Sequence, residues 1–189
     1  ALEGPSANLR ADLSVSSGER RLTDIEFSTR GAQLSGDIAQ NREGLFTGAL
    51  TLGATDISTA AALFLVEAQG AVNAQLSFQP RENGQHASVN ASATRLSLPQ
   101  LSLESGEAQA TIDDLFGVPA VEGNLQAGGL KLAGIQVATL TANAQTSGDA
   151  TNFSGQAALA NGTDISARGT LAPQAGGYLL TLDQAELTQ

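Results

Sequence analysis

Short alternations of apolar and polar residues recur along the whole chain, and this period of two constrains the fold most strongly. In the first of them, Leu9 to Val15, every second residue is apolar and the residues between are polar. A period of two places one set of side chains on a buried face of a β-strand and the other set in solvent. The same pattern runs through 72–78, 87–93, 121–127, 155–159 and 165–171.

Turn-forming residues separate these alternations. Asn161-Gly162 and Gly176-Gly177 tolerate the positive φ of tight hairpins, and Glu82–Gly84 and Ser147–Asp149 have similar turn chemistry. The spacing of the turns indicates about fifteen strands in an antiparallel protein. We therefore predict an all-β fold, although the many Ala and Leu residues are good helix formers.

One segment lacks the alternation. After Asp56, a candidate N-cap, the chain continues with helix formers, so we predict a short helix over 57–67 that is closed by Gly70. The tetrapeptide Thr-Asp-Ile-Ser stands here at 55–58 and again at 163–166, where a strand pattern follows. Its neighbours, and not the tetrapeptide itself, are expected to decide its structure.

Composition and charge exclude several classes of function. Nine Lys and Arg against 19 Asp and Glu give a net charge of −10, which argues against a nucleic-acid partner. Without Cys and with His86 as the one histidine, thiol chemistry and multi-histidine metal sites are excluded. We interpret His86 as a surface residue and Asp113-Asp114 as the end of a strand. We predict no enzyme activity, metal or cofactor.

The length and content of the chain suggest a fragment. The longest apolar run, Ala60 to Val66, has seven residues and is too short to cross a bilayer. The chain contains no Met, which predicts that it is an excerpt of a longer protein. Its apolar residues are mostly small, and the residues alone leave two interpretations open: closely packed sheets, or an inner surface that leaves room for a ligand.

Two stretches resemble the TamB family, which is related to the AsmA-like proteins. The first is 54–74, with its Ala- and Leu-rich run. The second is 114–132, whose Asp-Leu-Phe-Gly-x-Pro segment and glycine pair are similar to those of alphaproteobacterial TamB-like proteins. In the spacing of its strand and turn patterns, the resemblance covers about residues 44 to 160. Its motif residues are Asp114, Leu115, Phe116, Gly117, Pro119, Gly128 and Gly129.

The resemblance implies a fold and a function. TamB-like proteins are anchored in the inner membrane of Gram-negative bacteria and have a long, curled antiparallel sheet in the periplasm. The sheet forms an open hydrophobic groove that is thought to carry phospholipids to the outer membrane. The family is also linked to outer-membrane protein assembly with its barrel partner TamA. Residues 1–189 would be one continuous interior segment of the groove, with strands over 1–54, the short helix within 55–70 and strands over 71–189.

In such a groove, the in-phase apolar residues would contact phospholipid acyl chains. We expect the lining to consist of Leu50, Leu52, Val72, Ala74, Leu76, Phe78, Val89, Ala91, Leu96, Leu98, Leu101, Leu103, Ile112, Leu125, Leu130, Leu132, Ile135, Val137, Phe153, Ala157, Leu159, Ile165, Leu171, Leu180 and Leu182.

Two other functions remain open. The chain could be a structural β-sandwich or solenoid interaction domain, which would have a filled interior. It could also be a chaperone-like protein whose exposed sheet edges pair with strands of unfolded outer-membrane barrels. A solenoid carbohydrate lyase is disfavoured because clustered carboxylates with basic partners are missing.

Overall fold

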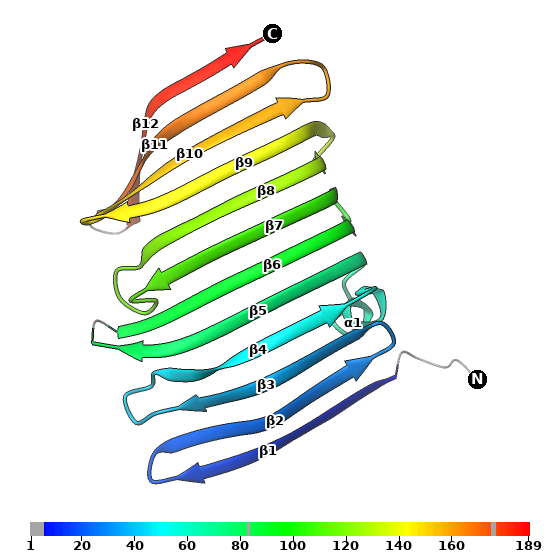
Figure 1. The fold of residues 1–189 in the computed structure, drawn as a ribbon, viewed down its shortest axis with the longest axis vertical. Coiled ribbons are helices and arrows are strands. Elements are labelled where there is room, and N and C mark those ends of the chain that lie inside the picture. The colour runs from blue at the N-terminus through cyan, green and yellow to red at the C-terminus, as the bar shows by residue number, and fades with distance from the viewer. Residues whose placement is uncertain (1–5, 83, 175–176) are drawn as a thin grey trace.

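The computed structural model describes residues 6–82, 84–174 and 177–189, and these form a single antiparallel sheet with one short helix (Figure 1). The elements are β1 (Ala7–Ser16), β2 (Glu19–Thr29), β3 (Ala32–Gln40), β4 (Phe46–Ala54), α1 (Ser58–Leu63), β5 (Gln69–Arg81), β6 (Gly84–Leu98), β7 (Leu101–Asp113), β8 (Ala120–Leu132), β9 (Ile135–Ser147), β10 (Ala150–Leu159), β11 (Asp164–Gln174) and β12 (Gly177–Thr188).

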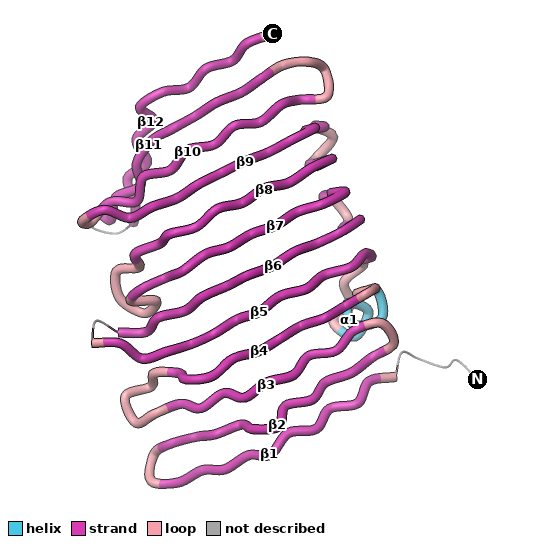
Figure 2. The backbone as a smooth tube through the Cα atoms, viewed as in Figure 1, coloured by secondary structure: helices cyan, strands magenta, loops and turns pink. Residues whose placement is uncertain are grey.

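The twelve strands are hydrogen-bonded in their chain order, from β1 at one edge to β12 at the other. Every neighbouring pair is antiparallel, so the chain advances by successive hairpins (Figure 2). The sheet does not close into a barrel, because β1 and β12 pair with one neighbour each. At about 4.8 Å between strands, it extends about 50 Å from edge to edge. The predicted all-β, open antiparallel fold is confirmed.

The number of strands is smaller than predicted because the strands are longer. The alternation over 121–127 and the leucines at 130 and 132 belong to one strand, β8, although the sequence between them contains a glycine pair. Similarly, β9 joins Ile135 and Val137 to the alternation that follows them. Glycines that resemble turn signals therefore lie inside strands.

The predicted helix is present but shorter. It covers Ser58–Leu63, and it ends because Leu65 adopts a positive φ of 58°. Gly70 does not close it and belongs to β5, where it lies at a register shift against β6 with a φ of 115°. In the described residues, no helix is long and apolar enough to span a membrane.

The buried apolar residues are few and lie near the margins of the sheet. In the described part of the chain they are Ile25, Ala32, Ala54, Ala68 and Ala87. Antiparallel sheets normally pack one face on a core. Here the described residues contribute neither a second sheet nor a long helix to cover either face, and many large apolar side chains are exposed (Figure 1).

Candidate functional site

One line of cross-strand neighbours crosses the whole sheet without a polar residue. We call it the apolar row, and it lies near the middle of the strands. From β1 to β12 its members are Leu9, Phe27, Leu34, Leu52, Ala74, Ala91, Ala108, Leu125, Ala142, Gly155, Ala167 and Ala185. Because side chains alternate between the faces of a strand, these residues share one face. We call it the apolar face.

The residues one position earlier or later form the opposite, polar face. The matching row there, from β1 to β12, is Asn8, Ser28, Gln33, Gly53, Asn73, Ser92, Glu107, Gln126, Thr141, Gln156, Ser166 and Glu186. Apart from Gly53, every member is polar. The two faces therefore differ in chemistry along the full width of the sheet, and the polar one is suited to water.

A groove of about 610 Å³ lies on the apolar face over β7 to β11. Its volume is in the range of small-molecule sites, roughly 300–1,000 Å³. The floor is low because alanine or glycine occupies the apolar row in four of these five strands, with Leu125 in β8 as the exception, and larger side chains flank it. The apolar residues that line the groove are Ala108, Ala110, Val121, Leu125, Leu140, Ala142, Ala144, Phe153, Ala157, Ile165 and Ala167.

The residues predicted to line a groove lie in rows of apolar neighbours. In β4 to β6, for example, Leu50 pairs with Leu76 and Leu76 with Val89. Of the predicted set, Leu125, Phe153, Ala157 and Ile165 contact the groove over β7–β11 itself. Most of the others extend the apolar rows on either side of it, whereas Leu171 pairs with Thr151 in β10.

At one end of the middle strands the alternation changes phase by one residue. Leu96 and Leu98 pair with Leu103 and Leu101, and this leucine cluster continues into β8 and β9. Arg95 has a φ of 50°, a conformation that rotates the strand between the two phases. The Cδ1 atom of Leu103 lies 3.4 Å from the place of a Cβ on Gly106, a member of the apolar face. The cluster therefore shares that face.

Sequence reasoning missed several groove residues that are in phase with those it identified. Ala108, Ala110, Val121, Leu140 and Ala142 belong to the same alternations. Side-chain size does not explain the omission, since Ala74, Ala91 and Ala157 were predicted to line a groove. The register shows that the alanines at 108, 110 and 142 keep the floor low, since leucines at all of these positions would fill the groove.

A loop closes the apolar face at one end of the strands. It carries the Asp-Leu-Phe-Gly-x-Pro motif, and its Phe116 ring lies 6.2 Å from Phe46, which in turn lies 6.3 Å from Phe78. The Leu115 N–H donates to the Gln85 carbonyl at 2.9 Å, and the Asp114 carboxylate accepts from the Val118 N–H at 3.0 Å. The motif therefore builds a wall of the apolar face.

The remaining motif residues have backbone roles. A Cβ on Gly117 would lie 2.1 Å from an Asp114 carboxylate oxygen, so a larger residue would displace the carboxylate that accepts from the Val118 N–H. Pro119 directly precedes β8, whereas Gly128 and Gly129 lie inside that strand. Gly128 pairs with Ser105, and Gly129 occupies the phase shift in β8 with a φ of 62°.

Gln85 joins both the motif loop and the start of β4 to β6 through hydrogen bonds. The pairing of β4 with β5 ends at Gly48 and Phe78, and Pro80, which lies beyond it, has no N–H to donate. The fully buried Gln85 side chain, opposite Pro80, donates to the Phe46 carbonyl at 3.0 Å and accepts from the Phe46 N–H. It thus supplies the hydrogen bonds that a neighbouring strand would make.

Replacing Gln85 with alanine should lower the free energy of unfolding by about 2 kcal/mol, because the Phe46 backbone groups lose their buried partners. Urea unfolding measures the change. Gln75→Ala, at an exposed amide of the adjacent strand, is the matched control and should change stability by less than about 0.5 kcal/mol. Equal effects of the two substitutions would contradict this role of Gln85.

The α1 segment lies at the other end of the strands, between β4 and β5 (Figure 1). Its start is anchored by Asp56, whose carboxylate accepts from the Ser58 N–H at 3.0 Å and from its hydroxyl at 2.9 Å. These hydrogen bonds hold the pKa of the Asp56 carboxyl below its ordinary value. Ala32 and Ala54, paired on the apolar face beside this segment, are buried. The apolar face is therefore covered locally at this end of β3 and β4.

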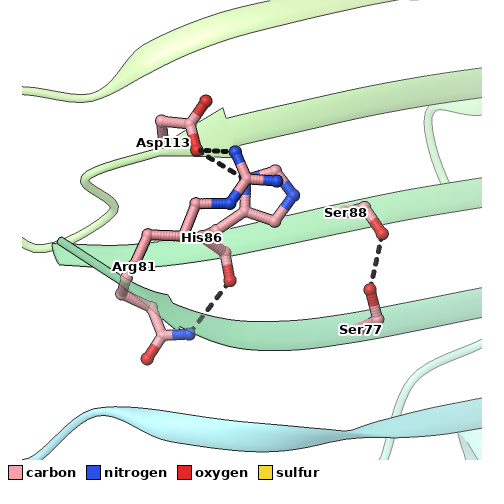
Figure 3. A network of polar contacts seen from close by, with 6 residues as sticks. Ser77, Arg81, His86, Ser88 and Asp113 are labelled. Atoms are coloured by element: carbon pink, nitrogen blue, oxygen red, sulfur yellow. Dashed lines mark hydrogen bonds and ion pairs between the residues drawn. The ribbon is translucent and has the colours of Figure 1, made fainter. Parts of the chain in front are cut away.

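A polar cluster lies on the polar face, at the same end of the strands as the loop that carries the Asp-Leu-Phe-Gly-x-Pro motif (Figure 3). The Asp113 carboxylate is 2.6 Å from Nδ1 of His86 and 2.9 Å from Nη1 of Arg81. The prediction that His86 is a surface residue is wrong, since its exposure is 9 %. Asp113 is the last residue of β7, as predicted.

This cluster joins the β5–β6 hairpin to the end of β7. A histidine–carboxylate pair can orient an imidazole, but nucleophilic catalysis also needs a hydroxyl, thiol or amine within hydrogen-bond reach. Among the residues that the structure describes, the His86 ring hydrogen-bonds to Asp113 and to no such group. Nor do the described residues include a group of three or more His, Cys, Asp or Glu side chains that could hold a metal.

No protein-family model, curated protein or solved structure matches this chain. The resemblance to the TamB family therefore stays a prediction.

Proposed function

We propose that the apolar face binds the acyl chains of phospholipids, and that the chain is a periplasmic segment of a TamB-like lipid conduit. The observation that carries this proposal is the apolar row, which crosses all twelve strands without a polar interruption. A hydrocarbon tail in water costs about 0.8 kcal/mol per CH₂ group. A surface that carries lipid through water must shelter the tail at every step, and a continuous row meets that need.

The size of the side chains also favours an acyl chain over a protein layer. Two packed sheets fill the space between them with large interdigitating side chains. The apolar row instead has alanine or glycine at Ala74, Ala91, Ala108, Ala142 and Gly155. Such a floor forms a smooth groove without individual pockets, which allows a flexible tail to slide. Because the described residues leave the apolar face open to solvent, the charged headgroup of a bound lipid can stay in water.

A photocrosslinking amino acid tests this proposal in cells. At Leu76, on the apolar face, it should capture phospholipid, whereas at Gln75, on the polar face of the same strand, it should capture almost none. Lipid adducts are measured by mass spectrometry of the purified protein. Leu132 and Lys131 provide a second matched pair. Equal lipid labelling at both members of each pair would refute acyl-chain binding by the apolar face.

The free edge of β12 supports a second candidate, a chaperone-like surface for strands of outer-membrane barrels. Leu179 and Leu180 point to opposite faces of this edge strand and are 52 % and 58 % exposed. Exposed edge strands can add a further strand through backbone hydrogen bonds. This candidate predicts that unfolded barrel peptides protect the β12 amides from hydrogen exchange. Lipid binding alone would protect the groove instead.

A further inference from the structure

The connection between β4 and β5 exposes four large apolar side chains in succession, beginning with Leu63 at the end of α1. Phe64, Leu65 and Val66 are 75 %, 96 % and 47 % exposed, and they follow directly after α1. We call them the apolar tip. They lie in the segment that connects the end of β4 to the start of β5, away from the groove over β7–β11 (Figure 1).

The backbone of the tip is held in a defined helix-terminating turn. The Leu65 N–H donates to the Ala62 carbonyl and the Val66 N–H to the Ala61 carbonyl, both at 3.1 Å. This is a Schellman motif, which places Leu65 at the left-handed position with a φ of 58°. Glycine is favoured there because a Cβ disfavours this conformation. The chain therefore keeps a leucine where its backbone is unfavourable and its side chain is almost fully exposed.

Charge narrows the choice of partner. Residues 55–70 contain Asp56 and Glu67 and no Lys or Arg, so attraction to anionic groups cannot draw the tip to its partner. The small area of the tip narrows the choice of partner further. The tip consists of three residues, whereas a stable protein–protein interface of standard size uses about 20–30 residues on each side. A small protruding apolar group is sufficient to enter the apolar boundary of a bilayer.

We propose that the apolar tip inserts into the surface of a lipid bilayer by apolar contact alone. Leu65, at the apex of the turn, would enter deepest, with Phe64 and Val66 beside it. This inference goes beyond acyl-chain binding by the groove, because it places the margin of the sheet next to α1 against a membrane. It holds whether or not the apolar face carries lipid.

Flotation of the whole chain with neutral phosphatidylcholine vesicles tests the proposal. The protein should float with the vesicles to an extent that salt does not reduce. Leu65→Gly should lower the bound fraction at least fivefold and also raise the melting temperature, because glycine suits the turn. A folding defect cannot produce this combination. Leu179→Ser, at an exposed leucine on the polar face of β12, is the matched control and should float like the parent protein.

A groove variant separates this proposal from lipid binding by the apolar face. Ala142→Asp, in the floor of the groove, should impair acyl-chain binding but leave flotation unchanged. Loss of flotation in Ala142→Asp, with normal flotation of Leu65→Gly, would overturn insertion by the tip and attribute vesicle binding to the groove.

Tryptophan fluorescence gives an independent measurement. The chain contains no tryptophan, so the emission of a single introduced tryptophan reports on its own position. In Leu65→Trp, vesicles should shift the emission to shorter wavelength, and phosphatidylcholine with brominated acyl chains should quench it. Tryptophan in place of Leu179 should show neither effect. Unchanged emission and no quenching at position 65 would overturn bilayer insertion and favour a protein as the partner of the tip.

Discussion

Replacing Ala142 with aspartate is expected to reduce the affinity for an acyl-chain probe at least tenfold. Ala142 lies in the apolar row at the floor of the groove, between Leu125 and Gly155. A bound tail would cover the carboxylate and separate it from water, and an unpaired buried charge costs several kcal/mol. The short aspartate side chain cannot extend its charge out of the groove as arginine can.

The neighbouring residue supplies the matched control. Thr141 lies on the polar face of the same strand and does not line the groove, so Thr141→Asp adds the same charge at the adjacent position. The net charge changes from −10 to −11 in both variants, and long-range electrostatics are equal. A fluorescent phospholipid with a neutral headgroup measures the affinity, and urea unfolding verifies that both variants are folded. If Ala142→Asp retained the affinity of Thr141→Asp, lipid binding by this groove would be excluded.

Replacing Gly48 with alanine is expected to lower the free energy of unfolding by more than about 4 kcal/mol, an exceptional effect for one methyl group. Gly48 has a φ of 137°, and a Cβ on it would lie 2.0 Å from the Asp37 carbonyl oxygen of the paired strand. Strands β3 and β4 would have to separate to admit the methyl group. Many domains are stable by only about 5–15 kcal/mol, so this variant should be largely unfolded at moderate temperature.

Gly53, in the same strand, provides the comparison. A Cβ there would have the Asn73 Oδ1 at 3.8 Å as its nearest neighbour, which is ordinary contact. Gly53→Ala should therefore be neutral or slightly stabilising, since alanine reduces the freedom of the unfolded chain. Thermal unfolding followed by circular dichroism measures both variants. Similar melting temperatures for the two would show that β3 and β4 can separate without loss of stability.

Part of the tertiary structure could be predicted because it depends on alternation alone. The pattern over 72–78 identified a strand and also the face of each residue, and the register pairs Ala74 and Leu76 with apolar neighbours on both sides. The two copies of Thr-Asp-Ile-Ser differ as expected. The copy at 55–58 leads into α1, and the copy at 163–166 enters β11. In both cases the following residues determine the outcome.

Other features depend on contacts between distant segments. His86 looked like a solvated residue because Asp113, its partner, stands 27 positions away and meets it only through the β6–β7 register. Gln85 likewise acquires its role from Pro80 and Phe46, which adjacent strands bring to it. The helix end could not be placed, because Leu65 adopts a conformation that its side chain disfavours.

The sequence by itself determined that the chain folds into strands with one apolar and one polar face, because a period of two assigns each side chain to a face without reference to any other strand. Only the tertiary structure decided that the strands align in chain order, so that Ala108, Leu125 and Ala142 become neighbours on one uncovered face. The physical reason is that register arises from hydrogen bonds and packing between strands, and these join residues that the chain keeps far apart.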